Sequence, residues 1–104
     1  MEMKHIVMWR VSGDTASERR INSVLIRNAF EELRGRIPGL LELEVGIDKS
    51  EVGYACDVVL YTRFQDAQSL AAYATHPAHL RVKCALGEIR TERYQVDYDF
   101  ASSP

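Results

Sequence analysis

The sequence is poor in the residues that mark a disulfide scaffold or a metal site. Its 104 residues include two cysteines, three histidines and three prolines. Cys56 and Cys84 are isolated and form no C-x-x-C motif, so two reduced thiols are expected rather than a disulfide. The chain also lacks an apolar segment long enough for a signal-peptide core or a membrane-spanning helix. We therefore expect a cytoplasmic protein with no membrane partner.

The sequence also has no large excess of positive or negative charge. Thirteen basic and fifteen acidic residues give a net charge of -2 and are spread along the chain without a long like-charge block. This balance argues against a nucleic-acid partner. The chain is 46% hydrophobic and 27% charged, which is ordinary for a globular domain. We expect a single domain over residues 1–104, with an ordered core at about 3–100, that needs no metal or disulfide to fold.

Hydrophobic periodicity predicts an alternation of strands and helices. Strands are predicted over residues 4–11, 40–47, 55–64 and 92–100, and helices over 17–37 and 66–86. The second helical segment is broken at His76-Pro77, because proline disfavours helical geometry in the residue before it. The order β-α-β-β-α-β is typical of the ferredoxin-like α+β fold, with an antiparallel four-stranded sheet and helices on one face.

The first helix is predicted to bury one apolar stripe against the sheet. Residues at helical spacing form this stripe, broadened by apolar neighbours. The stripe consists of Ile21, Leu25, Ala29 and Leu33, with Val24, Ile26, Phe30 and Ile37 beside it. Pro38-Gly39 ends the helix.

The predicted sheet has apolar residues on both of its faces. His5 shares one face of the first strand with Val7 and Trp9, whereas the opposite faces of the first and third strands carry Ile6, Met8, Val59 and Tyr61. Helices on one side leave the second face open. The simplest cover is a second copy of the sheet, so a homodimer through the sheet face is expected. The barrel or the dimer interface is the expected place of three tyrosines, Tyr61, Tyr94 and Tyr98.

Histidine gathers in the segment Tyr73-Ala-Thr-His76-Pro77-Ala78-His79, and the third histidine, His5, lies on the first strand. Because imidazole titrates near neutral pH, proton chemistry is sought here first. His76 and His79 are three residues apart, as metal ligands can be, but no carboxylate or cysteine is closely placed with them. No metal and no cofactor are expected.

Several short motifs resemble those of the stress-responsive A/B barrel (Dabb) family over essentially the whole chain. They are Lys4-His5-Ile6-Val7, Ile37-Pro38-Gly39-Leu40, Glu44-Val45-Gly46, Tyr73-x-x-His76-Pro77-x-His79 and Val96-Asp97-Tyr98. The resemblance implies a dimeric α+β barrel. The family's functions are diverse and include plant stress-associated proteins and a plant polyketide cyclase. In that cyclase, residues matching Tyr73 and His79 carry the chemistry, and a histidine matching His5 lies in the same pocket.

This resemblance implies catalytic roles for three residues. His79 is the general base that removes a proton next to a carbonyl, Tyr73 donates a hydrogen bond to the developing oxyanion, and His5 orients a substrate oxygen. The expected enzyme is cyclase-, lyase- or isomerase-like and binds a small molecule. In the alternative interpretation, the chain is a non-catalytic stress-associated or ligand-binding homodimer, in which His76 caps the broken helix and His79 only packs.

Arg93, Gln95 and Trp9 are the candidate substrate-binding residues. If the last strand is pleated as in the family, Arg93 and Gln95 face the helices, where the cyclase has apolar residues. Arginine there suits a carboxylate or a phosphate, and the alternative is an exposed Arg93 paired with a helix glutamate. Trp9 shares a face with His5 and is expected in the core, where it can also line a pocket. A polar wall argues against a long alkyl polyketide as the ligand, so the activity of that polyketide cyclase is not carried over to this chain.

Overall fold

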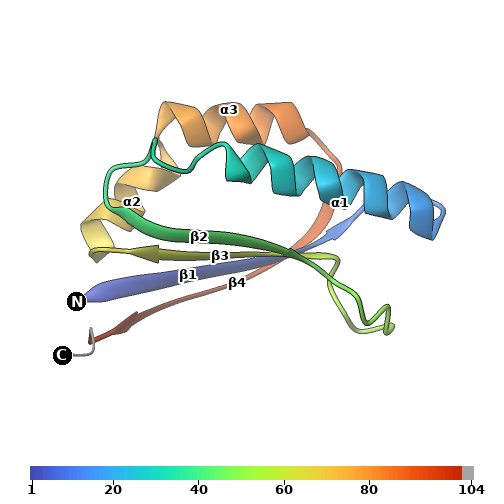
Figure 1. Ribbon diagram of the computed structural model, residues 1–104, viewed down its shortest axis with the longest axis horizontal. Helices are drawn as coiled ribbons and strands as arrows, with labels where there is room; N and C mark the ends of the chain where they lie inside the picture. The colour runs from blue at the N-terminus through green and yellow to red at the C-terminus, as the bar shows by residue number, and fades with distance from the viewer. Residues whose placement is uncertain (102–104) are drawn as a thin grey trace.

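A computed structural model describes residues 1–101, and the last three residues of the predicted domain, 102–104, lie outside it. One antiparallel sheet in the order β2-β3-β1-β4 is formed by β1 (Glu2–Val11), β2 (Leu40–Ile47), β3 (Val58–Phe64) and β4 (Arg90–Phe100). Helices α1 (Ala16–Glu31), α2 (Ala67–Ala74) and α3 (Pro77–Leu86) lie on one side of it (Figure 1). The predicted ferredoxin-like α+β fold is confirmed. None of the described helices is long and apolar enough to span a membrane.

Helix α1 is shorter than the periodicity predicts. It ends at Glu31 rather than at Ile37, and the chain continues in tighter turns. The amides of Leu33 and Arg36 donate to carbonyls three residues earlier, at 3.0 Å each. Gly35, with φ at 74°, takes a left-handed conformation that suits glycine. The buried side chains of these turns continue the helical spacing in the sequence without continuing the helix.

The buried stripe of α1 also differs from the predicted one. Ile21 and Leu25 are 62% and 50% exposed, whereas Ser23, Ile26 and Phe30 are the buried residues of the helix. The sequence holds two overlapping apolar stripes, and packing against the sheet selects the one that continues into Phe30. The hydroxyl of Ser23 is satisfied by the Arg19 carbonyl at 2.8 Å, so burying it costs little.

Three strands begin at other residues than predicted, and β1 begins at Glu2 instead of Lys4. β3 begins at Val58 instead of Ala55, and the Asp57 carboxylate accepts the Val11 amide at 2.9 Å. β4 begins at Arg90, two residues before the predicted Glu92. The bounds predicted for β2 and α3 match those observed. The early start of β4 places Arg90 beside the sheet residues of the candidate site.

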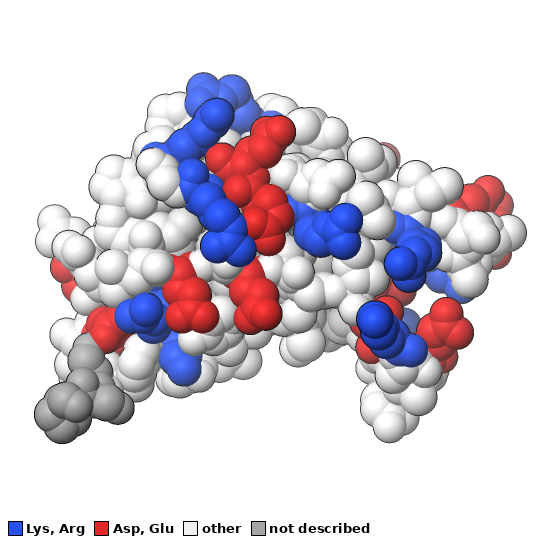
Figure 2. Space-filling view, in the orientation of Figure 1, with Lys and Arg blue, Asp and Glu red and all other residues white. Residues whose placement is uncertain are grey.

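The face of the sheet opposite the helices carries an apolar surface with no covering element in residues 1–101. Pairings such as Ile6 with Val96 and Met8 with Tyr94 bring its side chains into adjacent rows. We call this surface the outer sheet patch; it consists of Ile6, Met8, Val59, Tyr61, Tyr94, Val96 and Tyr98. By contrast, basic and acidic side chains lie next to one another on the molecular face shown in Figure 2.

Candidate active site

A cavity of about 230 Å³ lies between the helix-facing side of the sheet and helix α3. Its apolar lining consists of Val7, Trp9, Phe30 and Leu60. The Trp9 and Phe30 rings stack with centroids 5.1 Å apart, and both side chains are buried in the core. The cavity is smaller than the roughly 300–1,000 Å³ of most ligand pockets, so it suits a compact ligand.

The joint between α2 and α3 is built by His76 and Pro77. His76 is extended, with φ at -64° and ψ at 135°, and Pro77 occupies the first turn of α3. The Nδ1 atom of His76 accepts the Ala78 amide at 3.0 Å. His76 therefore caps α3, as the alternative interpretation predicted for this residue, and its Nδ1 atom is occupied by a backbone amide.

The joint brings Tyr73, at the end of α2, against His79, in the first turns of α3. Their rings stack with centroids 4.2 Å apart and planes inclined by 20°. Nδ1 of His79 lies 3.2 Å and 3.3 Å from the carbonyl oxygens of Tyr73 and Ala74. Because a carbonyl oxygen only accepts, Nδ1 carries the hydrogen, and Nε2 of the neutral ring keeps a lone pair.

The environment of His79 favours its neutral form. Burial lowers the pKa of His79 below the usual 6.5, and the charge of Lys83 and the proximity of His5 lower it further. Hydrogen bonds to the two carbonyl oxygens act in the opposite direction but are outweighed. His79 is thus a base that stays unprotonated at neutral pH.

The hydroxyl of Tyr73 is buried without a partner. The residue is 3% exposed and lines the cavity, and its oxygen forms no hydrogen bond with any group in the described part of the chain. Burial raises the pKa of Tyr73 well above its usual 10, although the charges of Arg93 and Arg90 oppose this. The phenol therefore keeps its proton and offers it as a hydrogen-bond donor. An unsatisfied buried hydroxyl costs about 1–3 kcal/mol, which a ligand acceptor would recover.

His5 is held on β1 by a carboxylate from β4. The two residues pair in register, and His5 Nδ1 lies 2.6 Å from Asp97 Oδ1. The carboxylate accepts, so Nδ1 carries a hydrogen. Thr62 donates to the His5 carbonyl at 2.7 Å, which fixes the backbone at the same point. The His5 ring meets Tyr73 edge-on, with centroids 6.1 Å apart, and lines the same cavity as His79.

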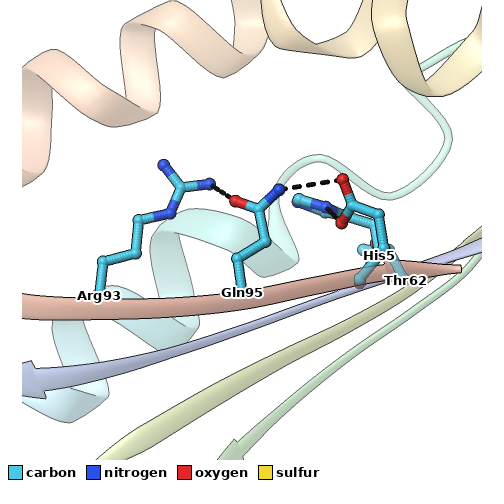
Figure 3. Close-up of polar contacts among 5 residues, drawn as sticks. His5, Thr62, Arg93 and Gln95 are labelled. Atoms are coloured by element: carbon cyan, nitrogen blue, oxygen red, sulfur yellow. Dashed lines mark hydrogen bonds and ion pairs between the residues drawn. The ribbon is translucent and has the colours of Figure 1, made fainter.

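A row of polar side chains continues from Asp97 along β4. Gln95 donates to the second Asp97 oxygen at 2.9 Å, and Arg93 donates to the Gln95 side-chain oxygen. Arg93 and Gln95 both point from β4 towards the helices (Figure 3). Arg93 is exposed, as the alternative predicted, but its partner in the described residues is Gln95 and not a helix glutamate. Arg93 and Trp9 line the cavity, whereas Gln95 lies outside its lining and joins Arg93 to the Asp97–His5 pair.

Sequence reasoning missed Lys83, Arg90 and Asp97 as site residues. Lys83 lies one helical turn after His79 and lines the cavity with Arg90, whose guanidinium lies 5.3 Å from the Trp9 ring centroid. The four-residue spacing on α3 is a signal that could have found Lys83. Asp97 could have been found by pairing the alternating residues of the first and last strands.

His76 and His79 do not form a shared ligand site, because the joint turns them to different partners. His76 Nδ1 accepts the Ala78 amide of α3, and His79 lines the cavity. Across residues 1–101, no group of three or more histidine, cysteine, aspartate or glutamate side chains is placed to hold a metal ion.

Comparison with known families decides the membership of this chain. The family model described as Stress responsive A/B Barrel Domain (Dabb) matches residues 3–100. The chain belongs to the Dabb family. It is 30% identical over 105 residues to the stress-response A/B barrel domain-containing protein DABB1 of Arabidopsis thaliana, covering 98% of this chain and 49% of that protein. The chain thus spans about half the length of this Dabb relative.

Solved structures share the Dabb fold. A dimeric ferredoxin-like protein of unknown function from Bacteroides fragilis has a TM-score of 0.83 at 30% identity, over 95% of this chain and 96% of that one. A hydroxynitrile lyase from Passiflora edulis has a TM-score of 0.77 at 13% identity, over 98% and 95%. At the lower identity the likeness establishes the fold alone.

Proposed function

We propose that this Dabb protein is an enzyme that moves a proton at the carbon next to a carbonyl group of a small molecule. The observation that carries the proposal is the unpartnered, buried Tyr73 hydroxyl beside His79. A donor without an acceptor and a neutral imidazole in one small cavity suit a carbonyl substrate better than a packed core. The family description, stress responsive, gives the setting of the protein but no reaction.

The chemical step assigns one role to each group. Nε2 of His79 takes the proton from the carbon, and the electrons of the C–H bond form the enolate. Tyr73 donates to the enolate oxygen, and His5, oriented by Asp97, binds a second substrate oxygen. His79 then returns the proton to the same or a neighbouring carbon, so no oxidant or reductant is needed. A positioned base and a buried donor typically contribute about 10²–10⁴-fold and 10²–10³-fold to such a rate.

The test is the exchange of protons of compact ketones and keto acids for deuterium in D₂O, monitored by proton NMR. We expect protein-dependent loss of the signal next to the carbonyl, about 10²-fold or more slower in His79→Gln. His76→Ala, which changes the cap outside the cavity, serves as the control and should keep the wild-type rate. If every compound exchanges only at its spontaneous rate, the enzyme proposal fails. Binding without exchange would support the alternative, a non-catalytic ligand-binding homodimer.

We also propose that two copies associate through the outer sheet patch. The patch is apolar and exposed, with Val96 at 59% and Met8 at 40%. A β-sheet with one bare apolar face gains free energy by packing on another sheet. The dimeric ferredoxin-like protein of Bacteroides fragilis has the same fold as this chain, which supports the pairing.

A further inference from the structure

The rim of the cavity carries positive charges that no carboxylate neutralises. Lys83, Arg90 and Arg93 all line it, and within residues 1–101 none of the three forms an ion pair. The lining contains a single carboxylate, Glu92, which is engaged elsewhere: one oxygen lies 2.9 Å from Arg10, and the other accepts the Tyr94 hydroxyl at 3.0 Å. The rim therefore differs from the mixed charges of the face in Figure 2.

Arg90 is the most confined of these cations. It is half-buried at the start of β4, and its guanidinium lies against the Trp9 ring. Burial and the charge of Arg93 lower the pKa of Arg90. A half-buried guanidinium retains its charge, and the aromatic face compensates only part of the lost hydration. An anion at the rim would supply the missing compensation.

The field of these cations also reaches the reacting groups. The charges of Arg93 and Arg90 lower the pKa of Tyr73 against the effect of burial, and the charge of Lys83 lowers that of His79. Positive charge near these groups stabilises an enolate oxygen and keeps the His79 base unprotonated. Anion binding and proton removal thus benefit from the same side chains.

We propose that the cavity binds a small keto acid, with its carboxylate between Arg90, Arg93 and Lys83 and its carbonyl at Tyr73 and His79. The inference rests on the proposed function and names its substrate class. A planar carboxylate matches the fork of a guanidinium, which donates two parallel hydrogen bonds. The Trp9–Phe30 stack provides an apolar surface for a compact aromatic or branched body. The small cavity excludes a long chain.

Matched probes test the charge requirement. Phenylpyruvate carries the carboxylate, and its methyl ester presents the same body and carbonyl without the charge. We expect calorimetric titration to give a Kd for the acid about tenfold or more below that for the ester. Added salt should weaken binding of the acid and leave binding of the ester unchanged.

Two substitutions locate the carboxylate. Arg90→Gln should raise the Kd of phenylpyruvate about tenfold and leave that of the ester within about twofold. The matched control is Arg81→Gln on the exposed side of α3, outside the cavity lining, which removes the same charge and should leave both Kd values unchanged. Because Arg90→Gln can loosen the packing of Trp9, Lys83→Gln on the exposed rim is the second variant. It should likewise raise the Kd of phenylpyruvate and leave that of the ester unchanged. Circular dichroism confirms the fold of each variant.

Equal affinity for acid and ester, or no binding of either, overturns the carboxylate site. It is also overturned if an excess of inorganic phosphate displaces phenylpyruvate, because the rim would then be a phosphate site. The proposed function fails separately: charge-selective binding of phenylpyruvate without exchange of its C3 protons retains the carboxylate site and removes the reaction. Exchange of protons on neutral ketones, without preference for the acid over the ester, retains the reaction and removes the carboxylate site.

Discussion

The Tyr73 phenol lies face to face with the His79 imidazole, with ring centroids 4.2 Å apart. The stack forms because the chain turns at His76-Pro77 and lays the first turns of α3 beside the end of α2. It aligns a protonated donor and an unprotonated base along one wall of the cavity. Among the described residues, the Tyr73 hydroxyl is a fully buried side-chain group without a hydrogen-bond partner.

Removing that hydroxyl should separate stability from activity. Tyr73→Phe keeps the stack and deletes a buried polar group, so urea unfolding should show equal or greater stability, by up to about 1 kcal/mol. Exchange next to the substrate carbonyl should fall about 10²–10³-fold, because the oxyanion loses its donor. Tyr54→Phe, on an exposed loop residue, is the control and should change neither quantity. A large loss of stability in Tyr73→Phe would contradict an unsatisfied hydroxyl.

The lowered pKa of His79 gives a signed pH dependence. In an NMR titration, the His79 ring should have its midpoint below 6.5, and exchange activity should persist to that lower pH before it falls. Folded His79 resists protonation while unfolded histidine binds a proton near 6.5. Its contribution to stability is therefore present above pH 6.5 and is lost as pH falls from there through the folded pKa. His79→Gln should remove this slope; an unchanged slope would assign it to other groups.

His76 is expected to matter for stability alone. His76→Ala removes the acceptor of the Ala78 amide at the start of α3 and should cost about 1 kcal/mol in the free energy of unfolding. His76→Asp replaces one capping acceptor by another and should restore most of that loss. Exchange kinetics should stay within about twofold in both variants, since His76 lies outside the cavity lining. A large loss of exchange in the stable Asp variant would place His76 in the chemistry.

The orientation of α1 can be tested with two neighbouring substitutions. Ile26→Ala leaves a cavity in the core and should cost about 2–5 kcal/mol, whereas Leu25→Gln should change stability by less than about 0.5 kcal/mol. Ile26 is fully buried, and Leu25 is half exposed. Chemical denaturation of both variants measures the difference. The reverse order of effects would restore the stripe predicted from the sequence.

The proposed dimer should be disrupted by a charge in the outer sheet patch. Light scattering at micromolar concentration should give twice the mass of the chain, and Val96→Asp should reduce it to the monomer mass by placing a charge in the apolar interface. Val52→Asp places the same charge on an exposed valine outside the outer sheet patch and should remain dimeric. A monomeric wild-type protein would remove the proposal.

The sequence predicted most of the fold because local patterns governed it. The alternation around Leu43 gave the bounds of β2, and the proline after His76 gave the start of α3. The prediction was wrong where the local pattern was compatible with two structures. Leu33 and Ile37 continue a helical period although Gly35 turns the chain, and Ile21 and Leu25 form a stripe that packing did not select.

The candidate site was predictable in part. The motif from Tyr73 to His79 pointed to the α2–α3 joint, and strand alternation placed His5 and Trp9 on one face. Asp97 required the pairing of β1 with β4, a contact between residues far apart in sequence. Arg90 could not be assigned to the site because the sequence placed the start of the last strand at Glu92, and only the structure shows that β4 begins at Arg90.

By itself, the sequence determined the order of elements, the family and the residue types available for proton chemistry, because periodicity, proline placement and short motifs are local properties. Only the tertiary structure decided that Tyr73 lacks a hydrogen-bond partner, that Asp97 holds His5 and that Arg90 lies over Trp9. Those properties depend on burial and on contacts between distant segments, which set the pKa of His79 and the charge of the cavity rim.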